Sequence, residues 1–306
     1  MACRLGFVLV RHFALLLLVL CLFPGIGIAQ QQHADAHFTP RVPHPAYAGD
    51  GPVVAIDQAH RNFHTLEGRY APFGRLLTAD GYRVRASTAP FSAQALGEVN
   101  VLVIANALSA TRGTSAFAPD EIASVRQWVE NGGSLLLIAD HAPFGSAAKA
   151  LAAAFGVNLD TGFAVVRQDG TTTANIQFRG RLLGQHPILE GRDASERIKA
   201  VQSFTGESLS VPAGATELLI LPRDAIGVIN RDDIQTLARG GSVDGMRIGG
   251  RAQAIAFNFG RGRVVVAGEA AMFTEQDFLW GDHVGLTTED DQQFALNVLH
   301  WLTRLI

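Results

Sequence analysis

The sequence has almost no cysteine, because Cys3 and Cys21 are the only two among its 306 residues. Both lie in an N-terminal segment with the features of a removable export signal. The mature chain would then contain no thiol. Disulfide bonds, a cysteine nucleophile and cysteine metal ligands are therefore excluded from its function.

Lysine and an excess of positive charge are also lacking. Lys149 and Lys199 are the only lysines, and the 25 basic residues are outnumbered by 28 acidic ones. Removal of Arg4 and Arg11 with the N-terminal segment leaves 23 basic residues and a net charge of −5, with histidine neutral. The arginines are scattered along the chain, so nothing in the charge pattern indicates a nucleic-acid-binding surface.

Long apolar runs are scarce as well. The run from Phe13 to Phe23 is shorter than the roughly 20 apolar residues that a membrane span needs, and no later segment approaches that length. Basic residues precede this run, and Ala29 ends a small-residue cleavage site. We predict a signal peptide over residues 1–29, cleaved after Ala29, and a periplasmic or secreted protein without a membrane span. An uncleaved N-terminal anchor is the alternative.

The remaining sequence predicts one α/β domain at 51–306, after a flexible lead-in at 30–50 that lacks apolar periodicity. Strands rich in Val, Ile and Leu alternate with helices, which is typical of a doubly wound, mostly parallel sheet. The predicted strands lie at 52–57, 82–87, 100–105, 134–139, 253–259 and 263–268, and the predicted helices at 68–80, 119–131, 146–155 and 289–304. Short strands rich in Gly and Thr predict a β-rich insertion at about 157–252, with strands at 163–167, 174–178, 217–221 and 225–229.

Three of the predicted strands end on ionisable residues. The carboxyl ends of strands in a doubly wound sheet border one crevice, so we predict a single polar site there. Its candidate residues are Asp57, His60, His64, Asp140, His141 and Glu269.

Two kinds of chemistry suit these side chains. Imidazole and carboxylate ligands bind zinc, manganese or iron, and we predict a divalent metal held by His60, His64 and Asp57. The two histidines would share one face if their segment were helical. Asp140, His141 and Glu269 are predicted to be catalytic, as general acid–base groups. Taken singly, Asp57 or Asp140 could instead cap the turn that follows its strand.

A few other residues receive less specific predictions. Asp282 and His283 lie in a glycine-bounded loop that could close over the crevice as a lid, and they are second-tier site candidates. Phe144 and Phe273 are candidates for lining the pocket. Glu207 is expected to be exposed to solvent.

Four motifs suggest a family. They are Gly132-Gly-Ser-Leu-Leu-Leu-Ile-Ala-Asp140-His141, His186-Pro-Ile-Leu-Glu-Gly191, Gly260-Arg-Gly-Arg-Val-Val-Val-Ala-Gly268-Glu269 and Asn297-Val-Leu-His-Trp301-Leu302. Over roughly 52–305 the chain resembles the class I glutamine-amidotransferase-like superfamily. It is most similar to non-amidotransferase branches that include trehalose-utilisation-like proteins and bacterial domains of unknown function. The resemblance implies a flavodoxin-like fold and a small polar ligand related to carbohydrates.

The chain departs from that family at its catalytic turn. True amidotransferases place a cysteine there, whereas this sequence has Asp140-His141, and no histidine accompanies Glu269. Glutamine hydrolysis by the family mechanism is therefore excluded. The leading hypothesis is an exported small-ligand-binding protein that hydrolyses a sugar- or amide-like metabolite with metal assistance. The alternative is a non-catalytic periplasmic sensor or assembly module with a degenerate site.

Overall fold

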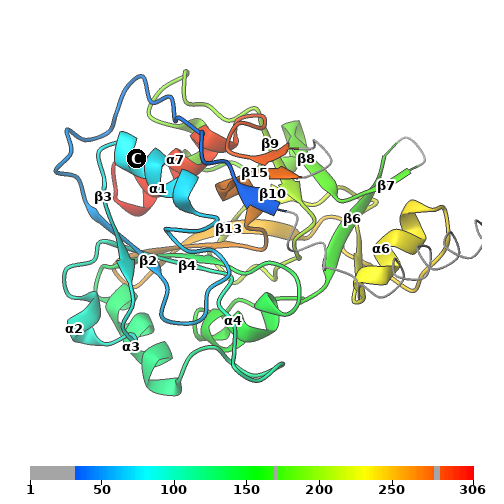
Figure 1. The fold of residues 1–306 in the computed structure, drawn as a ribbon, viewed down its shortest axis with the longest axis horizontal. Coiled ribbons are helices and arrows are strands. Elements are labelled where there is room, and N and C mark those ends of the chain that lie inside the picture. The colour runs from blue at the N-terminus through cyan, green and yellow to red at the C-terminus, as the bar shows by residue number, and fades with distance from the viewer. Residues whose placement is uncertain (1–31, 169–170, 279–282) are drawn as a thin grey trace, which may run out of the picture.

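A seven-stranded central sheet organises the computed structural model, which describes residues 32–168, 171–278 and 283–306. Its strand order is β10-β13-β14-β5-β4-β2-β3 (Figure 1). The strands are β2 (Val53–Asp57), β3 (Arg83–Ser87), β4 (Val101–Ala105), β5 (Ser134–Ile138), β10 (Thr216–Ile220), β13 (Ala252–Phe259) and β14 (Gly262–Ala267).

Most of this sheet is parallel, as predicted. The neighbours β14, β5, β4, β2 and β3 run parallel to one another, whereas β13 and β10 are antiparallel at one edge. β4 and β5 are completely buried. Their residues are apolar, except for Ser134 at the start of β5. Such strands need cover on both faces, which the helices supply.

Helices cover the two faces in separate layers. Helices α1 and α7 lie on one face, and α2, α3 and α4 lie on the other (Figure 1). Successive residues of a strand alternate between the layers: Leu136 belongs to the core on the α1 and α7 side, and Leu135 and Leu137 belong to the opposite core. The helices are α1 (Ala71–Ala79), α2 (Ala93–Leu96), α3 (Pro119–Glu130), α4 (Phe144–Ala154), α5 (Pro187–Glu190), α6 (Arg231–Ala238) and α7 (Asp291–Leu302).

The region between α4 and β13 contains the predicted β-rich insertion. Its strands form a four-stranded sheet, β12-β11-β6-β7, and a two-stranded sheet, β8-β9, while β10 joins the edge of the central sheet. These strands are β6 (Phe163–Gln168), β7 (Thr171–Thr173), β8 (Asn175–Arg179), β9 (Ala200–Phe204), β11 (Ile226–Val228) and β12 (Met246–Arg247). Two 3₁₀ helices, η2 (Gly180–Leu182) and η3 (Ala271–Phe273), lie in the connections.

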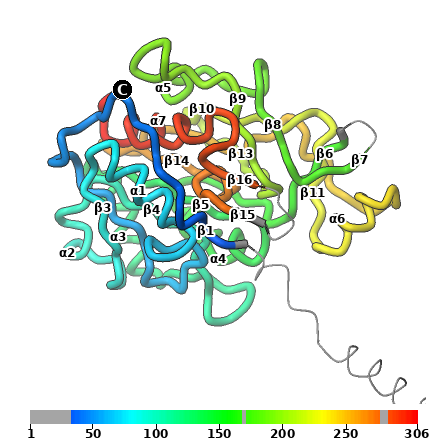
Figure 2. The backbone as a smooth tube through the Cα atoms, turned by 45° about the horizontal axis from the view of Figure 1, so that its top comes forward, coloured from blue at the N-terminus to red at the C-terminus, as the bar shows by residue number. Residues whose placement is uncertain are grey.

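The segment predicted as a flexible lead-in differs from that prediction where it is described. Strand β1 (Gln32–Ala34) pairs antiparallel with β15 (Glu275–Phe278), and β15 pairs in turn with β16 (His283–Gly285) (Figure 2). Phe38 is buried in the main core. One pairing with a distant strand and one buried aromatic side chain connect this segment to the rest of the fold. Neither contact produces a periodic pattern of apolar residues within the segment itself.

The predicted signal peptide lies outside the described residues. Within the described ranges, none of the helices combines the length and the apolar character needed to cross a membrane.

Candidate functional site

A cavity of about 510 Å³ opens at the carboxyl edge of the central sheet. Several of the polar residues that line it follow strands of the central sheet: His64 after β2, Asn106 after β4, Asp140 and His141 after β5, and Glu269 after β14. The carboxyl ends of the strands therefore place four of the six candidate residues around one cavity. Phe144 also lines it, whereas Phe273 lies in the core.

Asn106 connects two of these strand ends, and sequence reasoning did not include it. Its Oδ1 accepts a hydrogen bond from the backbone N–H of Asp140 at 2.9 Å, and its Nδ2 donates to Nδ1 of His64 at 3.1 Å. Because a backbone N–H can only donate, the amide orientation is fixed and the proton of neutral His64 lies on Nε2. Asn106 has a left-handed φ of 47°, which asparagine tolerates better than most residues. Its position directly after an apolar strand was the sequence feature that could have identified Asn106 as a site residue.

His64 is a buried, neutral imidazole. Burial, with a smaller contribution from the charge of Arg69, lowers the pKa of His64 to about 3. The ring packs against Tyr70, with 4.8 Å between the ring centroids. The site thus contains a hydrogen-bond donor, Nε2–H, that carries no charge near neutral pH.

Asp140 and Glu269 are two buried carboxyl groups of the same cavity. Burial, together with the negative charge of Asp140, raises the pKa of Glu269 to about 8. The carboxylate oxygens of Glu269 accept hydrogen bonds from the backbone N–H groups of Ala271 and Met272, at 2.6 and 2.9 Å. Burial also raises the pKa of Asp140, against the charge and the backbone N–H of His141, which lower it. The negative charge of ionised Asp140 therefore helps to keep Glu269 protonated.

His141 has a fixed ring orientation. Its Nδ1–H donates to the carbonyl oxygen of Ala142 at 2.8 Å, and the ring stacks on Phe163 with centroids 4.1 Å apart. Nε2 lies 3.8 Å from Oδ1 of Asp140. The imidazole is therefore held beside the carboxyl group of Asp140.

Glu207 is buried, so the expectation that it is exposed was wrong. Burial raises its pKa well above the usual range, and the charge of Asp140 raises it further. Its Oε2 accepts a hydrogen bond from the backbone N–H of Thr161, and its Oε1 has no partner among the described residues. A Cβ at Gly145 would lie 2.3 Å from Oε1, so α4 approaches this carboxyl group through a glycine. The local sequence around Glu207 carries no apolar pattern that signals burial.

Asp57 and His60 do not line this cavity. Nδ1 of His60 lies 2.9 Å from both carboxylate oxygens of Asp57, and Nε2 lies 2.9 Å from Oε1 of Glu121 on α3. The ring packs against Phe91 and Phe117. Both nitrogens are occupied by carboxylates, and this closed His60 cluster joins the end of β2 to the start of α3.

The predicted metal ligands are therefore separated. No α-helix forms over residues 58–70, so His60 and His64 do not share a helical face. His60 belongs to the cluster with Asp57, whereas His64 lines the cavity. Across the described parts of the chain, no group of three or more His, Cys, Asp or Glu side chains has a metal-binding arrangement.

The predicted lid loop is described only in part. Asp282 lies outside the described residues. Nε2 of His283 lies 2.6 Å from Oε1 of buried Glu275 and 2.7 Å from the hydroxyl of Thr287. His283 therefore forms polar contacts at the start of β16, and its neighbour Val284 lines the cavity.

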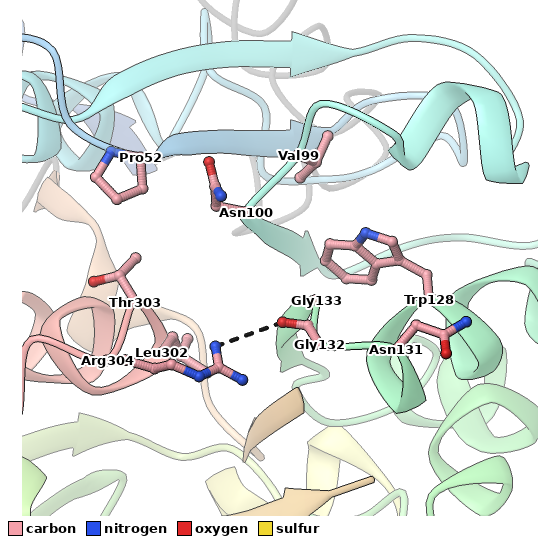
Figure 3. Close-up of a pocket in the computed structure, with 10 residues that line it drawn as sticks. All are labelled: Pro52, Val99, Asn100, Trp128, Asn131, Gly132, Gly133, Leu302, Thr303 and Arg304. Carbon is pink, nitrogen blue, oxygen red and sulfur yellow. Dashed lines mark hydrogen bonds between the residues drawn. The ribbon is translucent and has the colours of Figure 1, made fainter. Parts of the chain in front are cut away.

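A second cavity, of about 280 Å³, lies at the opposite edge of the sheet (Figure 3). Trp128, Asn131 and Arg304 are among its lining residues. The Arg304 guanidinium donates to the carbonyl oxygen of Gly132 at 3.5 Å. None of the described residues that line this cavity carries a carboxyl or imidazole group, in contrast to the first cavity.

A solved structure similar to this chain supports the fold. The N-terminal domain described as mmIFT52 matches with a TM-score of 0.59 and 14% identity, covering 82% of this chain and 97% of that domain. Two others are ThuA-like proteins, from Bacteroides uniformis and Parabacteroides merdae, both 14% identical to this chain. Their TM-scores are 0.45 and 0.43, and the matches cover 86% and 85% of this chain and 94% and 90% of theirs.

Neither the scan against protein-family models nor the search of curated proteins finds a match. ThuA-like proteins are thus present among the structural neighbours. Membership of the amidotransferase-like superfamily and the narrower flavodoxin-like assignment stay predictions.

Proposed function

We propose that this protein binds a small carbohydrate-related ligand in the cavity at the carboxyl edge and hydrolyses it. Asp140 acts as the general base and Glu269 as the general acid. The observation that carries the proposal is this pair of buried carboxyl groups in one cavity, both of which have a raised pKa. Two carboxyl groups with separated pKa values are the usual basis for assigning acid and base roles.

The protonation states of the residues that line the cavity support these roles. With a pKa of about 8, Glu269 retains its proton at neutral pH and can donate it to a leaving group. Ionised Asp140 can accept the proton of an attacking water molecule. Nε2–H of His64 supplies a neutral donor for a substrate oxygen, without adding charge to the site.

The walls of the cavity suit a small ligand with apolar faces and polar edges. Phe63, Phe144, Phe163 and Phe204 all line it, together with the polar groups at the strand ends. Small-ligand sites commonly combine an aromatic lining with a few placed polar groups. A sugar ring can pack its C–H faces on such rings while its hydroxyl groups reach the polar edge.

We also propose that the reaction takes place outside the cytoplasm. This part of the proposal rests on the sequence of residues 1–29, with basic residues, an apolar run and a small-residue cleavage site. N-terminal sequencing of the mature protein from the cell envelope or the medium tests it. A mature chain that retains residues 1–29 contradicts cleavage after Ala29.

The experiment for the catalytic proposal is a substrate screen with the mature protein. Nitrophenyl glycosides and nitroanilide amides are assayed with the parent, Asp140→Asn and Glu269→Gln, and with Glu190→Gln as an exposed control. Hydrolysis that both site variants lose and the control keeps supports the proposal. Saturable ligand binding without turnover in the parent contradicts it and favours the non-catalytic sensor.

Metal assistance remains part of the same test. The parent is purified without chelator, and its zinc, manganese and iron contents are measured beside His64→Ala and His60→Ala. If the parent contains stoichiometric metal, and His64→Ala lacks it while His60→Ala retains it, the metal is bound in the cavity. Metal that His60→Ala also loses would support the ligand set predicted from the sequence.

A further inference from the structure

One wall of the cavity comes from α6, a helix of the insertion. Arg231, Ile234 and Gln235 line the cavity and stand at the i, i+3 and i+4 positions that share one helix face. None of the residues of α6 is buried, and the helix packs near β7 and β11 at one end of the molecule (Figures 1 and 2). The face that it turns to the cavity is therefore open to a ligand.

Arg231 brings a positive charge to a cavity whose other charged groups are acids and histidines. It is the only arginine or lysine among the described residues that line the cavity. Its guanidinium has neither a hydrogen bond nor an ion pair within the described ranges. The acidic residues beside it, Asp232 and Asp233, do not line the cavity, and Asp233 accepts a hydrogen bond from Asn230 at 3.3 Å.

A guanidinium without a protein partner has its N–H donors available to a ligand. Its planar fork matches the oxygen spacing of a carboxylate or phosphate, which it can bind through two parallel hydrogen bonds. Glu269 adds no negative charge near neutral pH, because burial raises its pKa to about 8, so ionised Asp140 is the strand-end acid that shares the cavity with Arg231. Gln235, on the same helix face, adds an amide that can donate to the same group.

We propose that Arg231 selects a ligand bearing a carboxylate or phosphate group, so that the substrates are sugar acids or sugar phosphates rather than neutral sugars. This inference rests on the proposed function and narrows its substrate class. The sugar body lies between the aromatic rings and the strand-end acids, and the anionic group lies against α6.

The experiment compares matched ligands by isothermal titration calorimetry. The probes are glucose, galactose and mannose, the corresponding hexuronates, and the corresponding hexose phosphates, each titrated into the mature parent, Arg231→Gln and Arg239→Gln. Arg239 ends the same helix, is exposed and does not line the cavity, so its variant is the matched control.

We expect at least one anionic sugar to bind the parent about tenfold or more tightly than its neutral counterpart. Arg231→Gln should remove this preference, Arg239→Gln should keep it, and added salt should weaken it because Arg231 is exposed. The hexuronate and phosphate arms identify which anion is preferred.

Other outcomes overturn the inference in distinguishable ways. Equal or tighter binding of neutral sugars, or a preference that survives Arg231→Gln, overturns the role of Arg231 and leaves the proposed function intact. Absence of binding by every probe overturns both.

Discussion

The protein has two clusters of histidine and carboxyl groups, one at the end of strand β2 and one around the cavity, and they differ in hydrogen bonding and in protonation. In the His60 cluster, each imidazole nitrogen lies 2.9 Å from a carboxylate oxygen, and two phenylalanine rings cover the imidazole. In the cavity, Asp140 and Glu269 line open space, and within the described parts of the chain neither forms a salt bridge with lysine or arginine. In the His60 cluster both imidazole nitrogens are hydrogen-bonded to carboxylates, whereas in the cavity two carboxyl groups have raised pKa values.

The difference shows how the same residue types divide between structure and function. A buried ion pair that is fully hydrogen-bonded has no capacity left for a ligand, and breaking it costs stability. Carboxyl groups whose pKa is raised by burial, as it is for Asp140 and Glu269, can exchange protons with a substrate. We therefore expect substitutions in the His60 cluster to affect folding and those in the cavity to affect activity.

The largest expected effect is on catalysis, from Glu269→Gln. Loss of the general acid should lower kcat/KM for the substrate found in the screen by on the order of 10²–10⁴-fold. The melting temperature should not show a correspondingly large decrease, because the change removes a buried acid that is costly to ionise. Steady-state kinetics and thermal unfolding, with Glu190→Gln as control, measure both. Activity within a few-fold of the parent would remove Glu269 from the mechanism.

The next effect is on stability, from His60→Ala. This change leaves Asp57 and Glu121 without their shared partner, and removing one member of a buried ion pair typically costs about 3–5 kcal/mol. Denaturant unfolding measures the loss, and His44→Ala, at an exposed position, is the control. A loss near zero would mean that the closed cluster does not hold β2 to α3, and the contrast between the two clusters would fail.

Asn106→Ala should have a smaller effect on both properties. It leaves the N–H of Asp140 and Nδ1 of His64 without their partner, at a cost of about 1–3 kcal/mol for an unsatisfied buried group. The matched variant Asn106→Asp keeps an acceptor for Asp140 and adds a negative charge beside His64. NMR titration should then show a higher pKa for His64, and an unchanged pKa would contradict the proposed hydrogen-bond connection.

The smallest expected effect is on the pH dependence of stability, which should differ between the His60 cluster and the cavity. Burial lowers the pKa of His60, but the hydrogen bonds and charges of Asp57 and Glu121 outweigh it, and the net pKa is raised above 6.5. Protonated His60 therefore stabilises the fold below about pH 6.5, and this contribution is lost as the pH rises through the raised pKa.

Glu269 also has a raised pKa, but in a different pH window. The unfolded carboxyl group ionises near pH 4.5, whereas the folded one retains its proton to about pH 8, so its stability cost grows between these values. Unfolding free energies at several pH values should show that Glu269→Gln removes pH dependence from about pH 4.5 upward. His60→Gln should remove it only above about pH 6.5. Coincident windows for the two variants would contradict these assignments.

Much of the fold could be predicted from local pattern. The strands and helices of the central sheet form within a few residues of their predicted positions, because apolar strands and helices of sufficient length carry their periodicity in neighbouring residues. Strand β1 could not be predicted this way, since its partner β15 lies more than two hundred residues away in the sequence. Glu207 was missed for a similar reason, because its burial depends on α4 packing over it through Gly145.

The sequence by itself determined which side chains stand at the carboxyl edge, because each polar candidate follows an apolar strand that must end there. Only the tertiary structure decided which of them share a cavity. Local turns place His60 against α3 and His64 against Asn106, four residues apart but on different sides of the chain. Burial and neighbouring charge then separate the two clusters chemically, and both are properties of the packed molecule that no spacing of residues along the chain specifies.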